Sequence, residues 1–313
     1  MILRTSILLT AACIYALVVF PWQDSKPNSN RPHFSALGTN RNKDVAESSG
    51  LAFSQQIPNA IWTINDSGNS NRAFLLQTDG RLLAEVKLKD TSNIDWEALA
   101  GFEVDGRPHL MIADVGDNSL SRKSYQLYFF PEPDLSEPIQ NSGKKPVKQT
   151  IKPKKIQFKY EDGSKNCEAI GIDTDNQKIW LVEKVSFGAP RKKIPGVYAL
   201  DFSLKSEKKY RIAERIADFA PRNVTGMDFS HDGKSLIIRN YLNAHLYTRS
   251  ENHPWAEIIN ETKPRAVVLP LQRQGEAICF TPDSQAMIVT SEFTSQPIWK
   301  IKCAAQNPEE IKE

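Results

Sequence analysis

The stretch NIDWEALAGFEVDGRPHLMIADVGDN, residues 93–118, decides the fold of this chain. Two apolar, strand-like runs flank the pair Asp105-Gly106, which is a strong short-range signal for a β-hairpin. Glu97 lies at the start of the first run, and the second run ends in an acid- and turn-rich segment, 114–118. The stretch therefore predicts an antiparallel hairpin that carries polar side chains at one end.

The same pattern occurs five times along the chain, each time as a polar residue, a small residue and an apolar run. The copies read SSGLAFS, WEALAGF, CEAIGID, VTGMDFS and GEAICFT, and a second and third β-rich run follow in most of them. A period near 50 residues with several short strands per unit is the signature of a β-propeller. The polar residues that align in the five copies are Ser49, Glu97, Glu168, Thr225 and Glu276.

Five copies predict an all-β fold, a β-propeller of five blades. The last copy has only three strands, so the segment HFSALGT from His33 is expected to supply the fourth, and this N-terminal strand closes the ring without a free sheet edge. Six blades is the runner-up, if the Pro- and Lys-rich insertion at residues 132–155 hides a degenerate blade.

The predicted propeller domain spans residues 34–303, and a polar linker, 22–33, precedes it. Residues 1–21 combine Arg4 with an apolar run and are predicted to be a signal peptide or a membrane anchor. Residues 304–313 are expected to form a frayed tail. Either role of the N-terminal segment predicts a periplasmic or extracellular domain, and the anchor would also tether it to the membrane.

Composition and cysteine usage add little to this assignment. A net charge of +3 and the lack of a nucleic-acid-binding motif argue against a nucleic-acid partner. Besides Cys13, the chain contains Cys167, Cys279 and Cys303, which allow either one disulfide with a free thiol or three buried thiols.

The repeat predicts a polar site at one mouth of the channel. First strands line the channel of a propeller and second strands run back, so the starts of the former meet the ends of the latter. Carboxylate oxygens gathered there suit Ca²⁺, which takes about six to eight oxygen ligands, and the scattered histidines argue against zinc. The predicted metal ligands are Glu97, Glu168, Glu276 and Asp114. Side chains predicted to bind a substrate at this mouth are Asn65, Asp66, Asn118, Glu183, Lys184, Arg239, Asn240 and Glu292.

A second interpretation of the same residues is structural. Carboxylates that converge within a few ångströms repel one another, and they take up protons unless cations compensate them. Lys184 and Arg239 could pair with the glutamates in a network that holds no metal, and Asp117 and Asn118 could serve only to form a turn.

The motifs together resemble a known group of proteins. DWEALA, IADVGDN, LYFFPEP, NCEAIGID, VTGMDFSHDGKSLIIRNY, QGEAICFTPD and VTSE are similar to motifs of secreted bacterial β-propeller proteins of mostly unknown function. More distantly, they resemble the SdiA-regulated and the esterase-like phytase-type propellers. The resemblance covers about residues 45–295 and implies a propeller, export and calcium, and its phytase-type branch suggests phosphoester hydrolysis.

Two functions follow from these features. The first is a binding module of the cell envelope, whose channel mouth holds calcium and an unknown small molecule or envelope component. The second is a metal-dependent hydrolase of phosphoesters, esters or lactones, in which the metal would activate water. The chain has neither a G-x-S-x-G nor an H-E-x-x-H motif, so no catalytic residue is assigned.

Overall fold

The computed structural model describes residues 34–203, 210–250 and 253–303. The predicted export segment (1–21), linker (22–33) and frayed tail (304–313) lie outside the described residues. Within the described part of the chain, no helix is both long enough and apolar enough to span a membrane.

Each sequence repeat folds into antiparallel strands that are hydrogen-bonded to one another, and the predicted first, second and third strands of each repeat are confirmed. In order of the repeats, the sets are β2 (Ser48–Phe53), β3 (Ala60–Asn65), β4 (Arg72–Gln77) and β5 (Leu82–Leu88); β6 (Trp96–Val104), β7 (Arg107–Asp114), β8 (Tyr125–Pro131) and β10 (Lys154–Tyr160); β11 (Cys167–Asp173), β12 (Lys178–Glu183), β13 (Gly196–Asp201) and β14 (Arg211–Asp218); β15 (Val224–Phe229), β16 (Ser235–Asn240), β17 (Asn243–Thr248) and β18 (Arg265–Val268); β19 (Gly275–Phe280), β20 (Ala286–Ser291) and β21 (Gln296–Lys302).

The opening hairpin has the predicted turn. Val104 pairs with Arg107, which leaves Asp105 and Gly106 as a two-residue loop between β6 and β7. Both loop residues have positive φ, 50° and 71°, as a type I′ turn requires. Aspartate and glycine tolerate this conformation better than most residues, so local chemistry fixes the hairpin.

The N-terminal strand β1 (Phe34–Asn40) lies beside the last strand of the chain. It pairs antiparallel with β21, from Phe34 opposite Ile301 to Asn40 opposite Gln296. The fifth repeat is therefore part of a four-stranded sheet in the order β1-β21-β20-β19.

The insertion forms one helix and one strand instead of a further four-stranded set. Helix α1 (Ser136–Ser142) precedes β9 (Val147–Ile151), which pairs in parallel with β5 and extends that sheet to five strands. Strand β10 also pairs in parallel with β14, and this joins two sets into one eight-stranded sheet. A second short helix, α2 (Trp255–Glu261), lies against β14.

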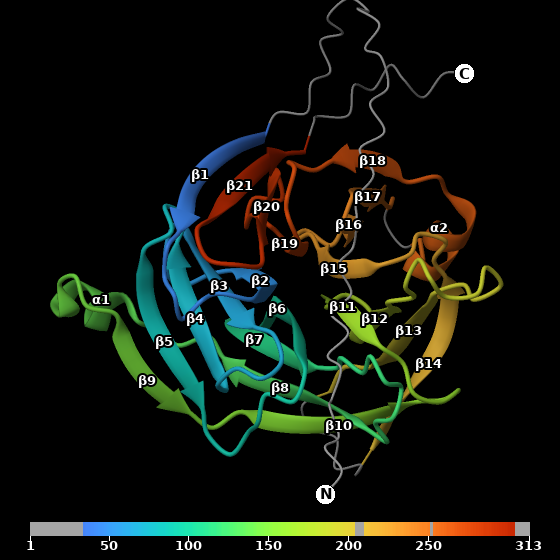
Figure 1. Cartoon of the computed structure of the whole chain (residues 1–313), viewed down its shortest axis with the longest axis horizontal. Coiled ribbons are helices and arrows are strands. Elements are labelled where there is room, and N and C mark those ends of the chain that lie inside the picture. The colour runs from blue at the N-terminus through green and yellow to red at the C-terminus, as the bar shows by residue number, and fades with distance from the viewer. Residues whose placement is uncertain (1–33, 204–209, 251–252, 304–313) are drawn as a thin grey trace, which may run out of the picture. The chain divides into compact units, whose positions relative to one another are not determined.

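The first strands of the five repeats contact one another in a closed circle. β2 contacts β6, β6 contacts β11, β11 contacts β15, β15 contacts β19, and β19 contacts β2. Figure 1 shows these strands nearest the centre of the domain, with the other strands of each set farther out. Sheets repeated around a common centre in this way have the architecture of a β-propeller.

Small residues allow this close approach. A Cβ atom at Gly50 of β2 would overlap the backbone nitrogen of Leu99 in β6, and one at Gly226 of β15 would lie 2.5 Å from the carbonyl oxygen of Glu276 in β19. These glycines occupy the small-residue position of the repeat, which alanine fills in the other copies. The polar-then-small pattern is thus a requirement of the central packing.

Apolar side chains fill the spaces between neighbouring sheets. One cluster combines Trp62 of the first repeat with Leu99 and Tyr128 of the second. Another combines Leu51 of the first repeat with Cys279 of the fifth, so the first and last repeats also share a core. Burial of these side chains is the main favourable term that holds the sheets together.

A substitution that adds one methyl group at Gly50 tests the close contact between β2 and β6. We expect Gly50→Ala to lower the free energy of unfolding of the full-length protein by about 1–3 kcal/mol, because the β2 and β6 backbones must move apart. Gly188→Ala is the matched control, since no atom lies within 4 Å of its added methyl group, and its effect should stay within about 0.5 kcal/mol. Chemical denaturation measures both; equal effects would contradict the proposed close packing.

Candidate functional site

A β-bulge at the start of each first strand positions the repeat's polar residue. Trp96 pairs with Asp114 and Ala98 pairs with Ala113, so Glu97 is the extra residue between them. In the other four repeats, the pairing register between the first and second strands also shifts at the aligned polar residue. A bulge turns a side chain out of the regular alternation of the strand and is common beside functional sites. The other bulged residues are Ser49, Glu168, Thr225 and Glu276.

The residues after the second strands reach the same mouth. The last residue of each second strand pairs with the residue just before the bulge, as Asp114 does with Trp96. The residue that directly follows this last residue is called its successor, and in several repeats it interacts with a bulged glutamate. The successors at the mouth are Asp66, Lys184, Tyr241 and Glu292, whereas the successor in the second repeat, Val115, is buried in an apolar cluster.

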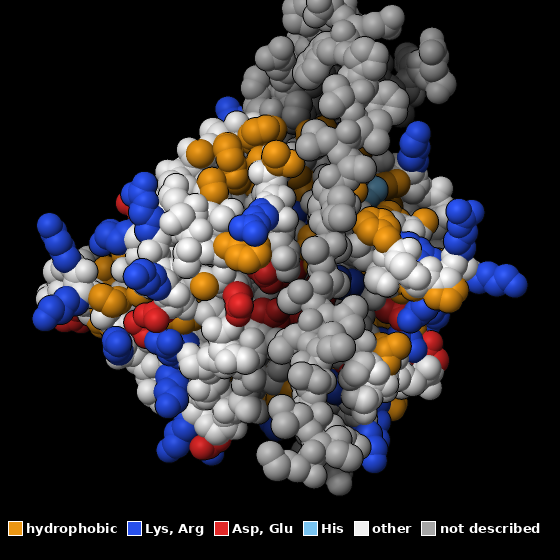
Figure 2. All heavy atoms as spheres, viewed as in Figure 1, with side chains coloured by type: hydrophobic (Ala, Val, Ile, Leu, Met, Phe, Trp, Pro, Cys, Tyr) orange, Lys and Arg blue, Asp and Glu red, His pale blue; other side chains and the backbone are white. Residues whose placement is uncertain are grey.

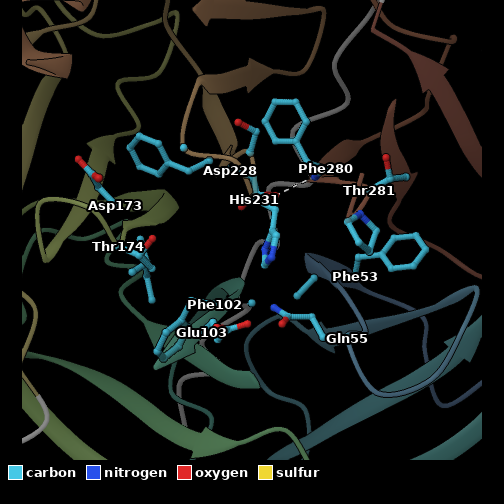
Figure 3. Close-up of a pocket in the computed structure, with 17 residues that line it drawn as sticks. Phe53, Gln55, Phe102, Glu103, Asp173, Thr174, Asp228, His231, Phe280 and Thr281 are labelled. Atoms are coloured by element: carbon cyan, nitrogen blue, oxygen red, sulfur yellow. Dashed lines mark hydrogen bonds between the residues drawn. The ribbon is translucent and has the colours of Figure 1, made fainter. Parts of the chain in front are cut away.

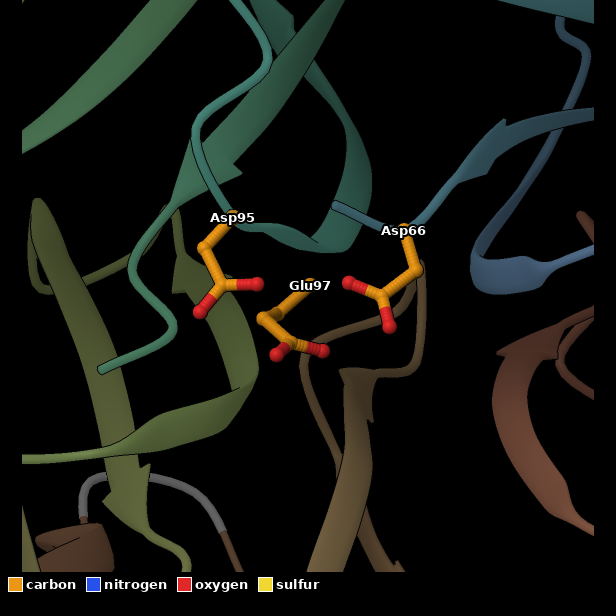
Figure 4. Close-up of side chains that lie close together, drawn as sticks. All are labelled: Asp66, Asp95 and Glu97. Atoms are coloured by element: carbon orange, nitrogen blue, oxygen red, sulfur yellow. The ribbon is translucent and has the colours of Figure 1, made fainter. Parts of the chain in front are cut away.

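Three carboxylates converge at this mouth and form the acidic triad Asp66, Asp95 and Glu97. One ligand oxygen from each lies within 4.8 Å of the others. Asp66 follows β3, Asp95 precedes β6, and Glu97 is the bulged residue of β6, so two neighbouring repeats build the triad. Figure 4 shows the three side chains pointing toward one another. Glu97 is buried, whereas the two aspartates are partly exposed.

Gly116 covers the triad from one side. A Cβ atom at this position would overlap the Asp95 carboxylate and lie 2.6 Å from Oε1 of Glu97. The Gly116 amide also donates to the carbonyl of Asp95 at 3.2 Å. Only glycine leaves room for the two carboxylates here, which explains its place in the segment that follows Asp114.

Burial in a group of like charges raises the pKa of these carboxyls. Burial is the main cause for Glu97, whose pKa lies well above its usual value, and Glu168 and Asp66 add repulsion. Burial raises the pKa of Asp66 to about 6. Burial, followed by the charge of Glu276, raises the pKa of Glu292 to about 9. These carboxyls therefore keep their protons to a higher pH than exposed carboxyls do.

The one lysine in this part of the mouth is already paired. Lys184 Nζ contacts both oxygens of Glu168 and donates to the Tyr241 hydroxyl at 2.8 Å. The Tyr241 hydroxyl donates in turn to Oε1 of Glu276 at 3.1 Å. Burial alone would lower the pKa of Lys184, but Glu168 raises it, so the amine stays protonated. Burial raises the pKa of Glu168 to about 8 despite this partner.

Two predicted site residues lie in ion pairs, and one of them, Asp114, also accepts from the Asp95 amide at 3.2 Å. Asp114 forms an ion pair with Arg122, and Glu183 forms one with Lys193, each with a nitrogen–oxygen distance of 2.8 Å. Both are the last residue of their second strand, so strand alternation directs their side chains away from the side on which their successors lie. The structure thus corrects the expected position of Asp114: Asp95, not Asp114, joins Glu97.

The predicted asparagines and arginine have backbone partners. Asn65 donates to the carbonyl of Asp44 at 2.7 Å, and Asn240 accepts from the amide of Leu242 at 2.9 Å. Arg239 is fully buried and donates to the carbonyl of Ala277 at 3.1 Å, and burial lowers its pKa to about 9. These residues support the loops and strands around the mouth.

Asp117 and Asn118 organise the loop that carries Gly116. Burial alone would raise the pKa of Asp117, but amide donors lower it, among them Ser121 at 2.9 Å and Arg122 at 2.8 Å. Asn118 accepts from the side-chain amide of Asn166 at 3.1 Å. The turn interpretation of these two residues is therefore the one that their contacts support.

Comparisons with known proteins identify no family. No protein-family description matches the chain, and no curated protein matches it. Among solved structures it is similar to the PQQ-bound aldose sugar dehydrogenase from Streptomyces coelicolor, with 9% identity, a TM-score of 0.44 and coverage of 87% of this chain and 98% of that one. A putative 6-phosphogluconolactonase from Bacteroides uniformis is 12% identical, with a TM-score of 0.39, and the match covers 83% of this chain and 68% of that one. The Pan2 WD40 domain from Neurospora crassa is 11% identical, with a TM-score of 0.41, and the match covers 85% of this chain and 95% of that one. The assignment of the architecture above rests on strand topology alone.

The raised pKa values predict a pH-dependent stability. Folded carboxyls with pKa values of about 6, 8 and 9 at Asp66, Glu168 and Glu292 bind more protons than unfolded ones do. The free energy of unfolding in EDTA should therefore be greatest near pH 4 and fall as pH rises toward about 9. Urea denaturation across this range tests the trend, and Glu97→Gln with Glu168→Gln should flatten it. A rise in stability with pH would contradict the assignment.

The Lys184–Glu168 pair predicts strong coupling between two substitutions. Lys184→Met leaves Glu168 buried beside other carboxyls without its cation, and we expect a loss of about 3–5 kcal/mol in the free energy of unfolding. Adding Glu168→Gln should recover at least half of that loss. Effects that simply add in the double variant would show that the two side chains do not interact.

Proposed function

We propose that this chain is an exported β-propeller whose channel mouth binds a divalent cation, Ca²⁺ first and Mg²⁺ second, and serves as a binding module of the cell envelope. The observation that carries the proposal is the convergence of Asp66, Asp95 and Glu97, with their oxygens within 4.8 Å of one another. The proposed propeller has five blades, one for each set of strands, and β1 closes the ring by its pairing with β21.

The donor set of the triad fits a hard cation. Ca²⁺–oxygen distances are about 2.3–2.6 Å, so oxygens on opposite sides of one ion lie about 5 Å apart. Carboxylate oxygens within 4.8 Å of one another satisfy this limit without a change of backbone. Three carboxylates can supply up to six oxygens, and each of them can bind through one or both.

The charge balance favours the same conclusion. Lys184 pairs with Glu168, and Arg122 pairs with Asp114. Burial raises the pKa of Asp95, and the charge of Arg122 offsets only part of this rise. Asp66 and Glu97 share a mouth with further acids, and their pKa values are raised by burial and repulsion. A divalent cation would remove this repulsion and keep the carboxylates ionised at neutral pH. Acidic side chains gather near the middle of the face in Figure 2, while Lys and Arg lie mostly around its periphery.

The binding role follows from the open side of the triad. Asp66 and Asp95 are partly exposed, so a bound ion would keep positions for water or for an oxygen of a ligand. A small molecule or envelope component with oxygen donors would fill these positions. The proposed location is the periplasm or the extracellular space, with residues 1–21 as signal peptide or tether.

A metal-dependent hydrolase is the second candidate. Lys184 and Tyr241 place an ammonium and a hydroxyl beside Glu168 and Glu276, where they could contact an anionic substrate held by the ion. The phytase-type resemblance suggests phosphoesters. Turnover of phosphoesters, esters or lactones that needs Ca²⁺ and is lost in Lys184→Gln would establish this candidate in place of a pure binding module.

Calcium binding predicts a thermal shift. A cation that binds only the folded state raises apparent stability by mass action, so millimolar Ca²⁺ should raise the melting temperature of the full-length protein relative to EDTA. The shift should disappear in Glu97→Gln and persist in Glu137→Gln, which removes a carboxylate from α1, a helix without buried residues. An equal shift in wild type and Glu97→Gln would exclude the triad as the binding site.

A further inference from the structure

A cavity lies at the end of the first strands opposite the acidic triad. Its volume is about 260 Å³, and it is lined by the last residues of β2, β6, β11, β15 and β19 and by the segments that follow them. The acidic triad lies at the starts of these strands. Figure 3 shows side chains around this cavity, with Asp228 and Phe280 on one side and Phe102 and Glu103 on the opposite side.

Asp228 is the distinctive side chain of this cavity. Protein surrounds it, yet part of its surface remains accessible, and it lines the cavity. One of its oxygens, Oδ2, accepts from the Phe280 amide at 2.8 Å, which fixes the carboxyl between β15 and β19. The other four repeats have small or weakly polar residues at the equivalent position, namely Ala52, Ala100, Gly171 and Cys279.

The rest of the wall combines apolar, neutral polar and negatively charged side chains, and Gln55, Thr174 and Thr281 are among the neutral polar ones. Glu103, at the end of β6, is exposed at the cavity. Asp173 is already satisfied, because its carboxylate accepts from the amide and the side chain of Asn176. None of the described residues that line the cavity is Lys or Arg. The aromatic side chains in the lining are Phe53, Phe102, Phe229 and Phe280, with His231 beside them.

A buried carboxylate holds one rim of the cavity in place. Glu132 accepts from the Ser54 hydroxyl, from the amide of Gln55 at 3.0 Å and from the indole of Trp62 at 2.7 Å. Gln55 lines the cavity. The rim is therefore fixed before any ligand arrives, which lowers the entropic cost of binding.

We propose that this cavity binds a small organic cation, an amine or quaternary ammonium compound, with its charge facing Asp228. A carboxylate without a Lys or Arg partner in the lining selects positive charge. The volume limits the ligand to a small molecule. The cavity and its residues are separate from the acidic triad, so the inference does not depend on calcium.

The chemistry of Asp228 agrees with this ligand class. Burial raises the pKa of its carboxyl to about 7, so its charged form is costly without a partner. An ammonium group beside it would offset this cost. An anionic ligand would have to enter against Asp228 and Glu103 together.

Choline and 3,3-dimethyl-1-butanol test the proposal because they share shape and differ in charge. Isothermal titration of the full-length protein at pH 8 in EDTA should show binding of choline and at least tenfold weaker binding of the neutral alcohol. Asp228→Asn keeps the side-chain shape and an oxygen for the Phe280 amide, and it should weaken choline binding at least tenfold. Equal binding of both compounds, or no binding of choline at millimolar concentration, would overturn the proposal.

Further variants separate the two ends of the channel. Glu97→Gln should leave choline affinity unchanged; if it abolishes choline binding while Asp228→Asn retains it, the ligand occupies the acidic triad and the proposal is wrong. Should Asp228→Asn not fold, Glu103→Gln replaces it, since Glu103 is exposed. A loss of threefold or more in that variant supports the site, and an unchanged affinity contradicts it.

Discussion

The close approach of the first strands is the constraint on which the rest of this structure depends. β2, β6, β11, β15 and β19 contact one another in a circle, and at Gly50 and Gly226 a single methyl group would overlap the neighbouring backbone. The small residue beside each bulge allows neighbouring first strands to approach this closely. Because the bulged residue is released from the regular alternation, its polar side chain reaches the mouth instead of entering the packed space between sheets.

Charge at the mouth follows from this geometry. Several acids there have cations of their own: Asp114 has Arg122, Glu168 has Lys184, and Glu183 has Lys193. None of the three triad carboxylates forms such an ion pair among the described residues, although burial raises the pKa of Asp95 and Arg122 lies near enough to offset part of this rise. Burying uncompensated carboxylates is costly, and groups arranged at such cost are concentrated at functional sites.

The two ends of the channel offer different chemistry. The starts of the first strands gather carboxylate oxygens suited to a hard cation, whereas their far ends form a cavity with phenylalanines around Asp228. All five repeats contribute strands to both ends of the channel, but only certain repeats supply the charged residues at each end. The acidic triad comes from the first two repeats, and Asp228 is present only in the fourth. Because the repeats differ at these positions, the two ends of the channel carry different side chains.

The repeat, the strands, the opening hairpin and the polar position at the start of every first strand were all predictable from the sequence. These features depend on alternation, turn chemistry and a period, all of which are local. The sequence indicated Asp114 and not Asp95 as a metal ligand, and it gave Tyr241 no role, although Tyr241 aligns with Lys184 directly after its second strand. Which acid meets which cation was decided only by the tertiary structure. A shift of one residue reverses the direction of a side chain on a strand, and residues far apart in the chain, such as Asp66 and Glu97, meet only when neighbouring sheets pack around the centre.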